Sequence, residues 1–332
     1  MKPNEEGKIW RPSGTLRKKT GLSISTISRY INSSGYVSEE SAQLIQKVIA
    51  ELDYIPNRNA QAIFNKKSGS IGLVIPSLVN PFFAEMATII GNNIQDDGFG
   101  CVLCFTEDDP GKEEAALDLL KGYRVDGIII ARGCNVEKIR KLTIPVVSFE
   151  TRIAEDIITI SADNYHGGRI AFEHLHEQGC RHILHIKGPN RFAATEDRCR
   201  GFQDAAGDRG VSVDVLPLNT DYLLEEDFDA ELDQLDFSKY DGIFVFNDIN
   251  CIYVINYLMR KGFSIPGDIQ VIGFDNSYLS SVNLPRLTTI EQSPREIAGT
   301  TYSCLVDLMK GQCESTKDRL VPVKLIKRET TR

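Results

Sequence analysis

From residue 70 onward, short continuous apolar runs alternate with longer segments of amphipathic spacing. The first run, Ile71–Ile75, has no polar alternation, which is typical of a strand buried on both faces of a parallel sheet. Further runs of this kind predict strands at Gly100–Phe105, Gly127–Ala131, Val146–Phe149, His182–Ile186, Gly242–Phe246 and Val271–Phe274. Amphipathic helices are predicted between them at Phe83–Asp97, Glu113–Gly122, His166–Gln178, Asp197–Asp208 and Ile249–Lys261. These repeated units predict two doubly wound parallel sheets of about six strands each.

Residues 15–52 instead predict three short helices. Thr15–Thr20 forms the first, and Ser23 caps the second. Ser38 caps the third, because a serine at this position satisfies free backbone N–H groups. The apolar positions of the third helix are Leu44, Ile45, Val48, Ile49 and Leu52.

The first two helices have the features of a helix-turn-helix. Gly21 provides the tight turn, and the small core would consist of Leu16, Leu22 and Ile27. The outward-facing residues of the second helix would be Ser25, Thr26, Ser28 and Arg29. Hydroxyl groups reach DNA phosphates, and an arginine can bridge O6 and N7 of guanine. Three amphipathic helices of an unrelated domain are the alternative at this point.

Charge separates the two parts of the chain. The formal net charge is −8, yet residues 1–68 contain 11 Lys/Arg and 6 Asp/Glu, against 27 and 40 in the remainder. A basic module joined to an acidic body is expected when only one end of a protein meets phosphates.

The first residues lack the apolar run of a secretion signal, so we expect none, and we find no apolar stretch long enough to cross a membrane. Its eight scattered cysteines suit a reducing compartment, so we expect a cytoplasmic, nucleoid-associated protein. Cys101 and Cys104 have the spacing of a metal or redox pair, but they fall on a predicted buried strand. Residues three apart on a strand point to opposite faces, so we interpret both as core cysteines.

Catalytic motifs are missing from the sequence. Gly98-Phe-Gly100 lacks the third glycine of a dinucleotide site, and there is no P-loop or Gly-x-Ser-x-Gly elbow. The histidines do not form a His-Glu-x-x-His zinc motif. We therefore expect no enzyme activity, no catalytic residues, no cofactor and no metal.

Longer motifs follow one another in a characteristic order. In the N-terminal part they are Gly21–Asn32, Gly35–Ser38 and Asp53–Asn57. In the remainder they are Asn80–Phe83, Val125–Ile128, Asp163-Asn164 with Gly167-Gly168, Gly201-Phe202, Asn247-Asp248, Val271–Asp275, Leu287–Ile290 and Pro322-Val323. In order and spacing this set, which covers the chain beyond residue 15, resembles the lactose-repressor (LacI/GalR) family. Phe149–Arg152 with Ser161–Asn164 is similar to the sucrose and ribose repressors.

The resemblance implies a small all-α helix-turn-helix head and an α/β core like that of periplasmic sugar-binding proteins. The head would span residues 10–56, the hinge helix and linker 57–69, and the effector-binding and dimerisation domain 70–332. The last would have two subdomains, about 70–160 with 292–322 and about 161–291 with 323–332. The implied function is a sugar-responsive, homodimeric transcription repressor of a carbohydrate operon, bound to double-stranded operator DNA.

The resemblance also implies residues that contact DNA. Ile24, Ser25 and Arg29 fall where the family reads bases, and Thr26, Ser28 and Asn32 where it holds phosphates. Tyr54 of the head is also assigned to DNA, and the hinge would add Asn57, Arg58 and Ala60, with Ile63 as an apolar wedge that kinks the duplex. An ordinary linker is the alternative for the hinge.

For the effector, polar residues stand just after predicted strands or at helix starts, where ligands bind in such folds. They are Glu150, Arg152, Asp163, Arg198, Asn247, Asp275 and Gln292, with Phe82 and Tyr222 to stack on a ring. Positions 82, 150, 198, 222, 247, 275 and 292 match the family's effector positions. Carboxylates with an arginine suit vicinal hydroxyls, so we expect a sugar or sugar phosphate. Each residue taken alone could be a surface charge or a helix cap.

Some positions depart from the family pattern. Ser13 and Arg17 replace an apolar and a small residue of the first helix, and Trp10 could supply the missing packing. Glu150 is longer than the aspartate usual there. The main alternative function, a sugar-binding protein without a DNA role, predicts a secretion signal and no basic head, and neither expectation fits this sequence.

Overall fold

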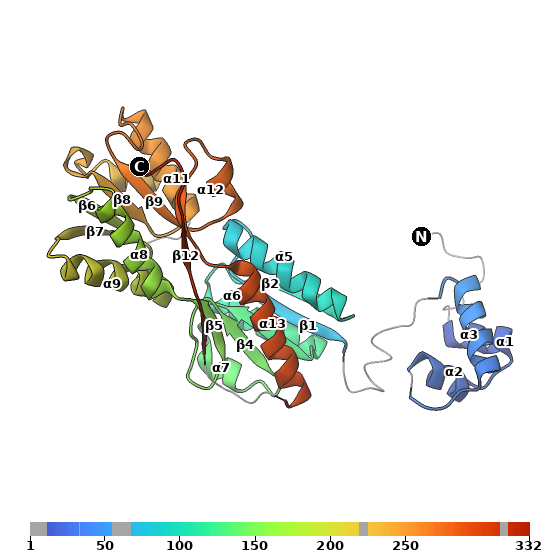
Figure 1. The fold of residues 1–332 in the computed structure, drawn as a ribbon. Coiled ribbons are helices and arrows are strands. Elements are labelled where there is room, and N and C mark those ends of the chain that lie inside the picture. The colour runs from blue at the N-terminus through green and yellow to red at the C-terminus, as the bar shows by residue number, and fades with distance from the viewer. Residues whose placement is uncertain (1–11, 33, 55–67, 219–224, 313–317) are drawn as a thin grey trace. The chain divides into compact units, whose positions relative to one another are not determined.

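The computed structural model describes residues 12–32, 34–54, 68–218, 225–312 and 318–332. The chain divides into two compact units, residues 1–69 and 70–332 (Figure 1). The described part of the smaller unit is helical up to residue 54, and the larger unit is an α/β structure with two sheets. This architecture confirms the predicted fold class.

The head, residues 12–54, is built from α1 (Pro12–Thr20), α2 (Ile24–Ile31) and α3 (Glu39–Glu51). The predicted caps are present, since the hydroxyls of Ser23 and Ser38 accept backbone N–H groups in the first turns of α2 and α3. The helices enclose a small core of Leu16, Ile27, Ile45 and Val48. Leu44, predicted at an apolar position, is instead 38% exposed, because it lies at the edge of the buried stripe of α3.

Two six-stranded sheets form the larger unit. The first consists of β1 (Ser70–Ile75), β2 (Gly100–Phe105), β3 (Gly127–Ala131), β4 (Val146–Phe149), β5 (Thr159–Ala162) and β11 (Arg319–Val321). The second consists of β6 (Ile183–Lys187), β7 (Val213–Pro217), β8 (Gly242–Val245), β9 (Gln270–Asp275), β10 (Thr288–Glu291) and β12 (Lys324–Ile326). Their strand orders are β11-β5-β4-β3-β1-β2 and β12-β10-β9-β8-β6-β7. All pairs are parallel except β10 with β12, as the continuous apolar runs predicted.

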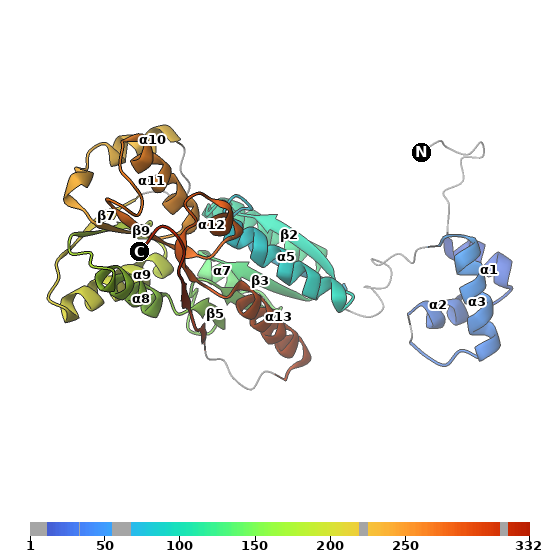
Figure 2. The ribbon, with the colours of Figure 1, turned by 45° about the horizontal axis from the view of Figure 1, so that its top comes forward.

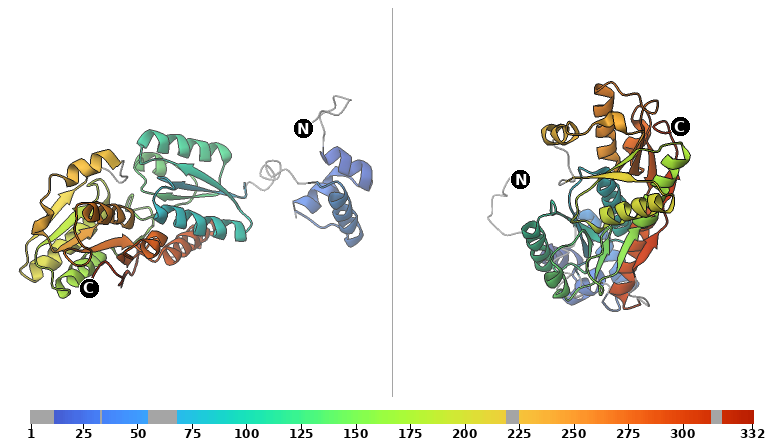
Figure 3. Two further views of the ribbon diagram at one scale, coloured as in Figure 1. Left: turned by 90° about the horizontal axis from the view of Figure 1, so that it is seen from above. Right: turned by 90° about the vertical axis from the view of Figure 1, so that its left-hand side faces the viewer.

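Helices cover both faces of each sheet (Figures 2 and 3). Those of the first sheet are α5 (Pro81–Asp96), α6 (Pro110–Tyr123), α7 (Val136–Arg140) and α13 (Pro294–Lys310). Those of the second sheet are α8 (Asn164–Glu177), α9 (Ala193–Asp208), α10 (Glu225–Leu232), α11 (Asp248–Arg260) and α12 (Tyr278–Val282). Helices α5 and α13 pack together on one face of the first sheet, and α8 and α9 pack together on the second.

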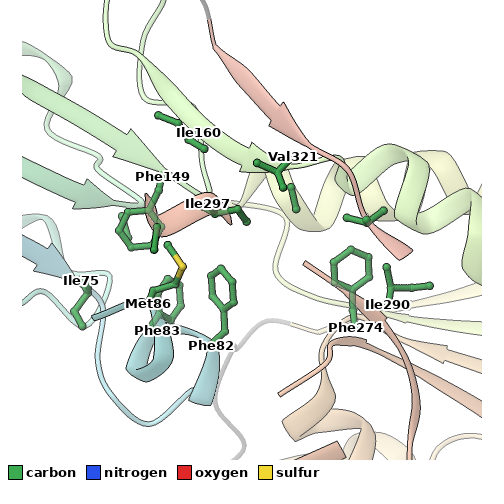
Figure 4. Packing of buried hydrophobic residues seen from close by; sticks show 14 of the residues in the cluster. Ile75, Phe82, Phe83, Met86, Phe149, Ile160, Phe274, Ile290, Ile297 and Val321 are labelled. Carbon is green, nitrogen blue, oxygen red and sulfur yellow. The ribbon is translucent and has the colours of Figure 1, made fainter. Parts of the chain in front are cut away.

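One hydrophobic core continues from sheet to sheet. It joins Phe83 and Phe149 of the first sheet's layers to Phe172 and Phe274 of the second (Figure 4). The chain crosses between the sheets after β5, after β10 and between β11 and β12. Side chains that follow the strands of both sheets are therefore held close together.

Two details of the sequence analysis change. The run Gly100–Phe105 was expected to be a buried strand, but β2 pairs with β1 alone and Phe105 is 45% exposed. The two cysteines of β2 do lie on opposite faces, since Cys101 packs against the core under α5 and Cys104 belongs to the core under α6. The sequence pattern predicts no element at β5, β7, β10 to β12 or α13, all of which the structure contains. The strands among these are only 3–5 residues long, too short to show a clear period.

Candidate DNA-binding surface and effector site

Helix α2 has one buried and one exposed side. Ile27 is buried in the head core, whereas Ile24 (52% exposed), Ser25 and Arg29 face solvent. This is the arrangement that a recognition helix needs, since its inner side fixes the helix and its outer side enters the major groove.

The residues expected to hold phosphates lie at the margins of α2. Thr26, Ser28 and Asn32 are half-buried. The Thr26 hydroxyl lies 2.9 Å from the Ser23 hydroxyl, and the Asn32 amide donates to the Ser28 hydroxyl at 3.1 Å. These contacts orient the polar groups before any partner arrives.

Of the remaining residues assigned to DNA, Tyr54 is half-buried and packs at the edge of the head core. Its backbone N–H donates to the Ile49 carbonyl at 3.0 Å. The other four lie outside the described residues: Asn57, Arg58, Ala60 and Ile63.

Helix α1 accommodates its departure from the family pattern. Leu16 is buried, while Arg17, Lys18 and Lys19 are exposed at the last turn. Arg17 thus adds a cation to the surface and leaves the head core undisturbed. Trp10 lies outside the described residues, as does the side chain of Ser13.

In the larger unit, strained backbone gathers at the carboxyl ends of strands. Non-glycine residues there have φ between 50° and 121°, namely Glu107, Asp108, Arg132, Glu150, Asp275, Asn276 and Ser293. Elsewhere in the described part of this unit, only Arg124 does so. Such conformations cost about 1–3 kcal/mol each and persist where the surroundings impose them, often at binding sites.

Arg132, which follows β3, links the two halves of the larger unit. Its Nε donates to both carboxylate oxygens of Glu150 at 3.1 and 3.0 Å, and a terminal nitrogen donates to Asp108 at 3.3 Å. Its guanidinium carbon lies 4.9 Å from the centre of the Phe83 ring and 4.0 Å from that of Phe192, which precedes α9. The side chain is only 8% exposed.

Arg198 is the buried arginine of the second half. Helices α8 and α9 pack so closely that a Cβ at Gly168 or Gly201 would collide with the other helix's backbone. This approach lets Arg198 on α9 donate to Asn164 on α8 at 2.8 Å and to the Phe246 carbonyl at 2.5 Å. Its guanidinium carbon also lies 3.7 Å from the centre of the Phe274 ring.

Asp275, at the end of β9, interacts through its charge with both Arg132 and Arg198. Gln292 donates to it at 2.5 Å, and Arg198 lies 4.0 Å away. Burial raises the pKa of Asp275 to about 6, although the positive charge of Arg198 counteracts this effect. Glu150 and Arg132 also act on Asp275 through their charges. We refer to six residues together as the inter-sheet cluster: Asp108, Arg132, Glu150, Arg198, Asp275 and Gln292.

Two expected effector residues serve as helix caps. The Asn247 side chain accepts the N–H of Asn250 at 2.9 Å, and the Asp163 side chain accepts that of His166 at 2.9 Å. Capping was the alternative interpretation for single residues of this set. Phe82, at the start of α5, is buried on the side of the core turned toward Phe274 (Figure 4).

The structure does not bring Arg152 to the cluster. Its side chain is 56% exposed and pairs with Asp318 at 2.9 Å. Tyr222 lies outside the described residues. The arginine that pairs with Glu150 is Arg132, which the sequence analysis missed together with Asp108.

A further polar group, also missed, stands at the end of β6. The Lys187 amine donates to Asn190 at 2.9 Å and to Glu196 at 2.5 Å. These two partners lie on either side of Phe192 in the sequence. Glu150 was selected because it directly follows a predicted strand. Arg132 and Lys187 also directly follow predicted strands, so the same criterion predicts both of them.

No helix among the described residues is long and apolar enough to span a bilayer. Within the same residues, no group of three or more His, Cys, Asp or Glu side chains is placed to hold a metal ion.

Comparison with known proteins gives matches to both units. Residues 18–57 match the model of bacterial regulatory proteins of the lacI family, and residues 172–331 match that of a periplasmic binding protein-like domain. The ribose operon repressor of Halalkalibacterium halodurans is 33% identical over 319 residues, which cover 96% of each chain. The chain belongs to the lacI family. It is therefore a DNA-binding transcription regulator of the repressor type, and not an enzyme.

Further relatives and solved structures are similar to this chain. The transcriptional regulator DegA of Bacillus subtilis is 32% identical over 95% of this chain and 96% of its own. A solved periplasmic binding protein/LacI regulator from Alkaliphilus metalliredigens, in complex with D-xylulofuranose, is 42% identical with a TM-score of 0.74, covering 79% of this chain and 99% of its own. The lac repressor dimer bound to operator shares the fold, with a TM-score of 0.84 at 24% identity over 95% of this chain and 97% of its own.

Proposed function

We propose that this lacI-family regulator represses a carbohydrate-utilisation operon and that a sugar bound at the inter-sheet cluster controls it. The observation that carries the proposal is the pair of buried arginines, one from each half, each held beside carboxylates and an aromatic ring. Fixed charged hydrogen-bonding groups on an apolar wall suit a polyhydroxylated ligand. Relatives named as ribose and sucrose operon repressors, and the solved relative with D-xylulofuranose, support the same ligand class.

The effector-binding residues in this proposal come from both halves. They comprise the inter-sheet cluster and Phe82, with Asp163, Asn247 and Tyr222 as further contacts. Arg152 is left out because of its outward pairing with Asp318. The functional division is a head at 10–56, a hinge and linker at 57–69, and an effector domain of two subdomains at 70–332.

For DNA, the proposal has a homodimer on a near-palindromic operator, as two-fold symmetry requires. Ile24, Ser25 and Arg29 read bases, and Thr26, Ser28 and Asn32 hold phosphates. Tyr54 of the head also contacts the DNA, and the hinge residues Asn57, Arg58, Ala60 and Ile63 act in the minor groove. Such a protein works in the cytoplasm on the nucleoid.

Effector binding would change the relation of the two subdomains. Arg132 already contacts Phe192 across them, so a ligand at this contact alters groups of both halves. A coupling free energy of about 1–3 kcal/mol between effector and operator is typical of such regulators.

The test is operator binding by the full chain, with and without sugar. Operator fragments selected from random DNA are titrated at several salt concentrations, and ribose, xylulose or sucrose is then added. We expect sequence-specific, salt-dependent binding that one sugar changes about 5- to 150-fold. Binding that ignores both DNA sequence and every sugar contradicts the proposal.

A further inference from the structure

The charges around the inter-sheet cluster are already balanced by side chains of the chain itself. Two of its residues, Arg132 and Arg198, are cations with buried side chains, and Lys187 at the end of β6 is a third buried cation of the second half. Each has a carboxylate partner within 4.0 Å. A site built for an anion instead presents cations whose charge the ligand neutralises.

Arg132 gives the clearest case. Two carboxylates, Asp108 and Glu150, accept its N–H groups, and the side chains of both are about as buried as its own. The rings of Phe83 and Phe192 lie near the guanidinium. The triad of one cation and two carboxylates carries net negative charge, which repels a phosphate or carboxylate ligand.

Arg198 and Lys187 leave little positive charge for a ligand. Arg198 shares its donors between the Asn164 side chain, the Phe246 carbonyl and the nearby Asp275. Lys187 donates to Asn190 and Glu196. A fourth cation, Arg191, stacks 4.6 Å from the Phe192 ring centre but is exposed.

The two buried acids of the second half point in the same direction. Burial raises the pKa of both Asp275 and Asp248. The negative charge of Glu150 adds to the effect on Asp275, and that of Asp275 adds to the effect on Asp248. The positive charges of Arg198 and Arg132 and the hydrogen bond from Gln292 all lower the pKa of Asp275, and it is still raised. The surroundings therefore disfavour even the negative charge that the chain supplies.

From this charge balance, we propose that the effector is an uncharged polyol and that the carboxylates of Asp108 and Glu150 exclude phosphorylated sugars. This inference rests on the proposed function and narrows its ligand class. The carboxylates accept hydroxyl hydrogens, and the arginines donate to hydroxyl oxygens, so a vicinal diol satisfies both without adding charge. A phosphate ester would meet at least two buried carboxylates around Arg132.

The test compares each sugar with its own phosphate ester on the full-length protein. Thermal unfolding and calorimetry are run with D-ribose and D-ribose 5-phosphate, D-xylulose and D-xylulose 5-phosphate, and sucrose and sucrose 6-phosphate. Inorganic phosphate at constant ionic strength serves as a bare anion. We expect a neutral member to bind at least about tenfold more tightly than its ester, a difference of about 1.4 kcal/mol, and no effect of millimolar inorganic phosphate.

Variants test the cause. Asp108→Asn with Glu150→Gln frees the Arg132 charge and should give the protein measurable affinity for inorganic phosphate. Asp156→Asn is the matched control, since it removes a carboxylate from an exposed arginine pair, Arg140 with Asp156, on the same sheet's layer. It should gain nothing.

The outcomes separate this inference from the proposed function. An ester that binds as tightly as its sugar, or more tightly, overturns the inference while leaving a sugar-type regulator in place; loss of that binding in Arg191→Ala would identify the cation responsible. A folded double variant without phosphate affinity also contradicts the inference. If no member of any pair binds or changes operator affinity, the proposed function fails, and the inference fails with it. The comparison of sugar and ester needs only the wild-type chain, so it stands even if the double variant does not fold.

Discussion

The head and the inter-sheet cluster both contain arginines, but those of the head are exposed to solvent and those of the cluster are buried. Arg29 and Arg17 of the head are exposed at the surface of a small helical core. Arg132 and Arg198 of the larger unit are buried, paired with carboxylates and placed against aromatic rings. Exposed charges suit a polyanion that arrives with its own counterions, and buried paired charges suit a ligand recognised by geometry.

This difference predicts where salt, pH and mutation act. Substitutions in the head should change DNA affinity together with its salt dependence. Substitutions in the cluster should change effector affinity and stability, while the intrinsic affinity of the head for DNA is kept.

The largest effect is expected for Arg198→Ala. The variant leaves Asp275 buried without its nearest cation and the Phe246 carbonyl without a donor, so we expect a loss of stability of about 3–5 kcal/mol. Effector affinity should fall by about two orders of magnitude or more. Chemical denaturation and calorimetry measure both, and a variant as stable as the wild type that still binds effector contradicts the site.

The next largest effect is a difference in effector affinity between variants of two arginines that follow neighbouring strands. Arg132→Ala should weaken effector binding by about 2 kcal/mol, because it removes the proposed donor to the ligand and the cation that holds the carboxylates of Glu150 and Asp108 in place. Arg152→Ala should change it by less than about 0.5 kcal/mol, since that side chain pairs in solvent with Asp318. Calorimetry on both variants is decisive, and the reverse order would restore Arg152 to the site.

The comparison of Arg132 with Arg152 also shows what could not be predicted from the sequence. Continuous apolar runs located the central strands of both sheets, because strands covered on both faces leave no other pattern. The same runs placed Glu150 and Asp275 at strand ends. The direction of a side chain after a strand depends on the backbone conformation there. Arg132 and Glu150 have left-handed φ angles, and their residue types alone do not predict this conformation. The sequence therefore predicted the edge of the sheet that forms the site, but not the partner of Glu150.

In the head, Arg29→Ala should weaken specific operator binding by about 1–3 kcal/mol, the typical value of a bidentate contact with guanine. Binding to unrelated DNA should change much less. Fluorescence anisotropy with the selected operator and a scrambled duplex measures both. Equal losses on the two duplexes would assign Arg29 to phosphates instead of bases.

A smaller effect is expected from pH. The pKa of Asp275 is raised from 3.8 to about 6, so its charged form is disfavoured in the folded chain, and the stability that the protonated form contributes is lost as pH rises through 6. Effector affinity should show the opposite trend and fall as pH drops from 7 to 5, because the protonated group accepts fewer hydroxyl hydrogens. The measured affinity of Asp275→Asn should be weaker but nearly flat in this range. A pH slope that persists in Asp275→Asn belongs to another group.

The smallest effect concerns the departure in the first helix. Arg17 adds an exposed cation beside Lys18 and Lys19, and it makes no contribution to the buried side of α1, where Leu16 packs. Arg17→Ala should therefore leave the stability of the head within about 0.5 kcal/mol of the wild type. If this cation meets a phosphate, affinity should fall equally for operator and scrambled DNA, and the slope of log K against log salt should decrease by about 1. An unchanged slope would mean that Arg17 points away from the duplex, so the head's extra charge would play no part in DNA binding.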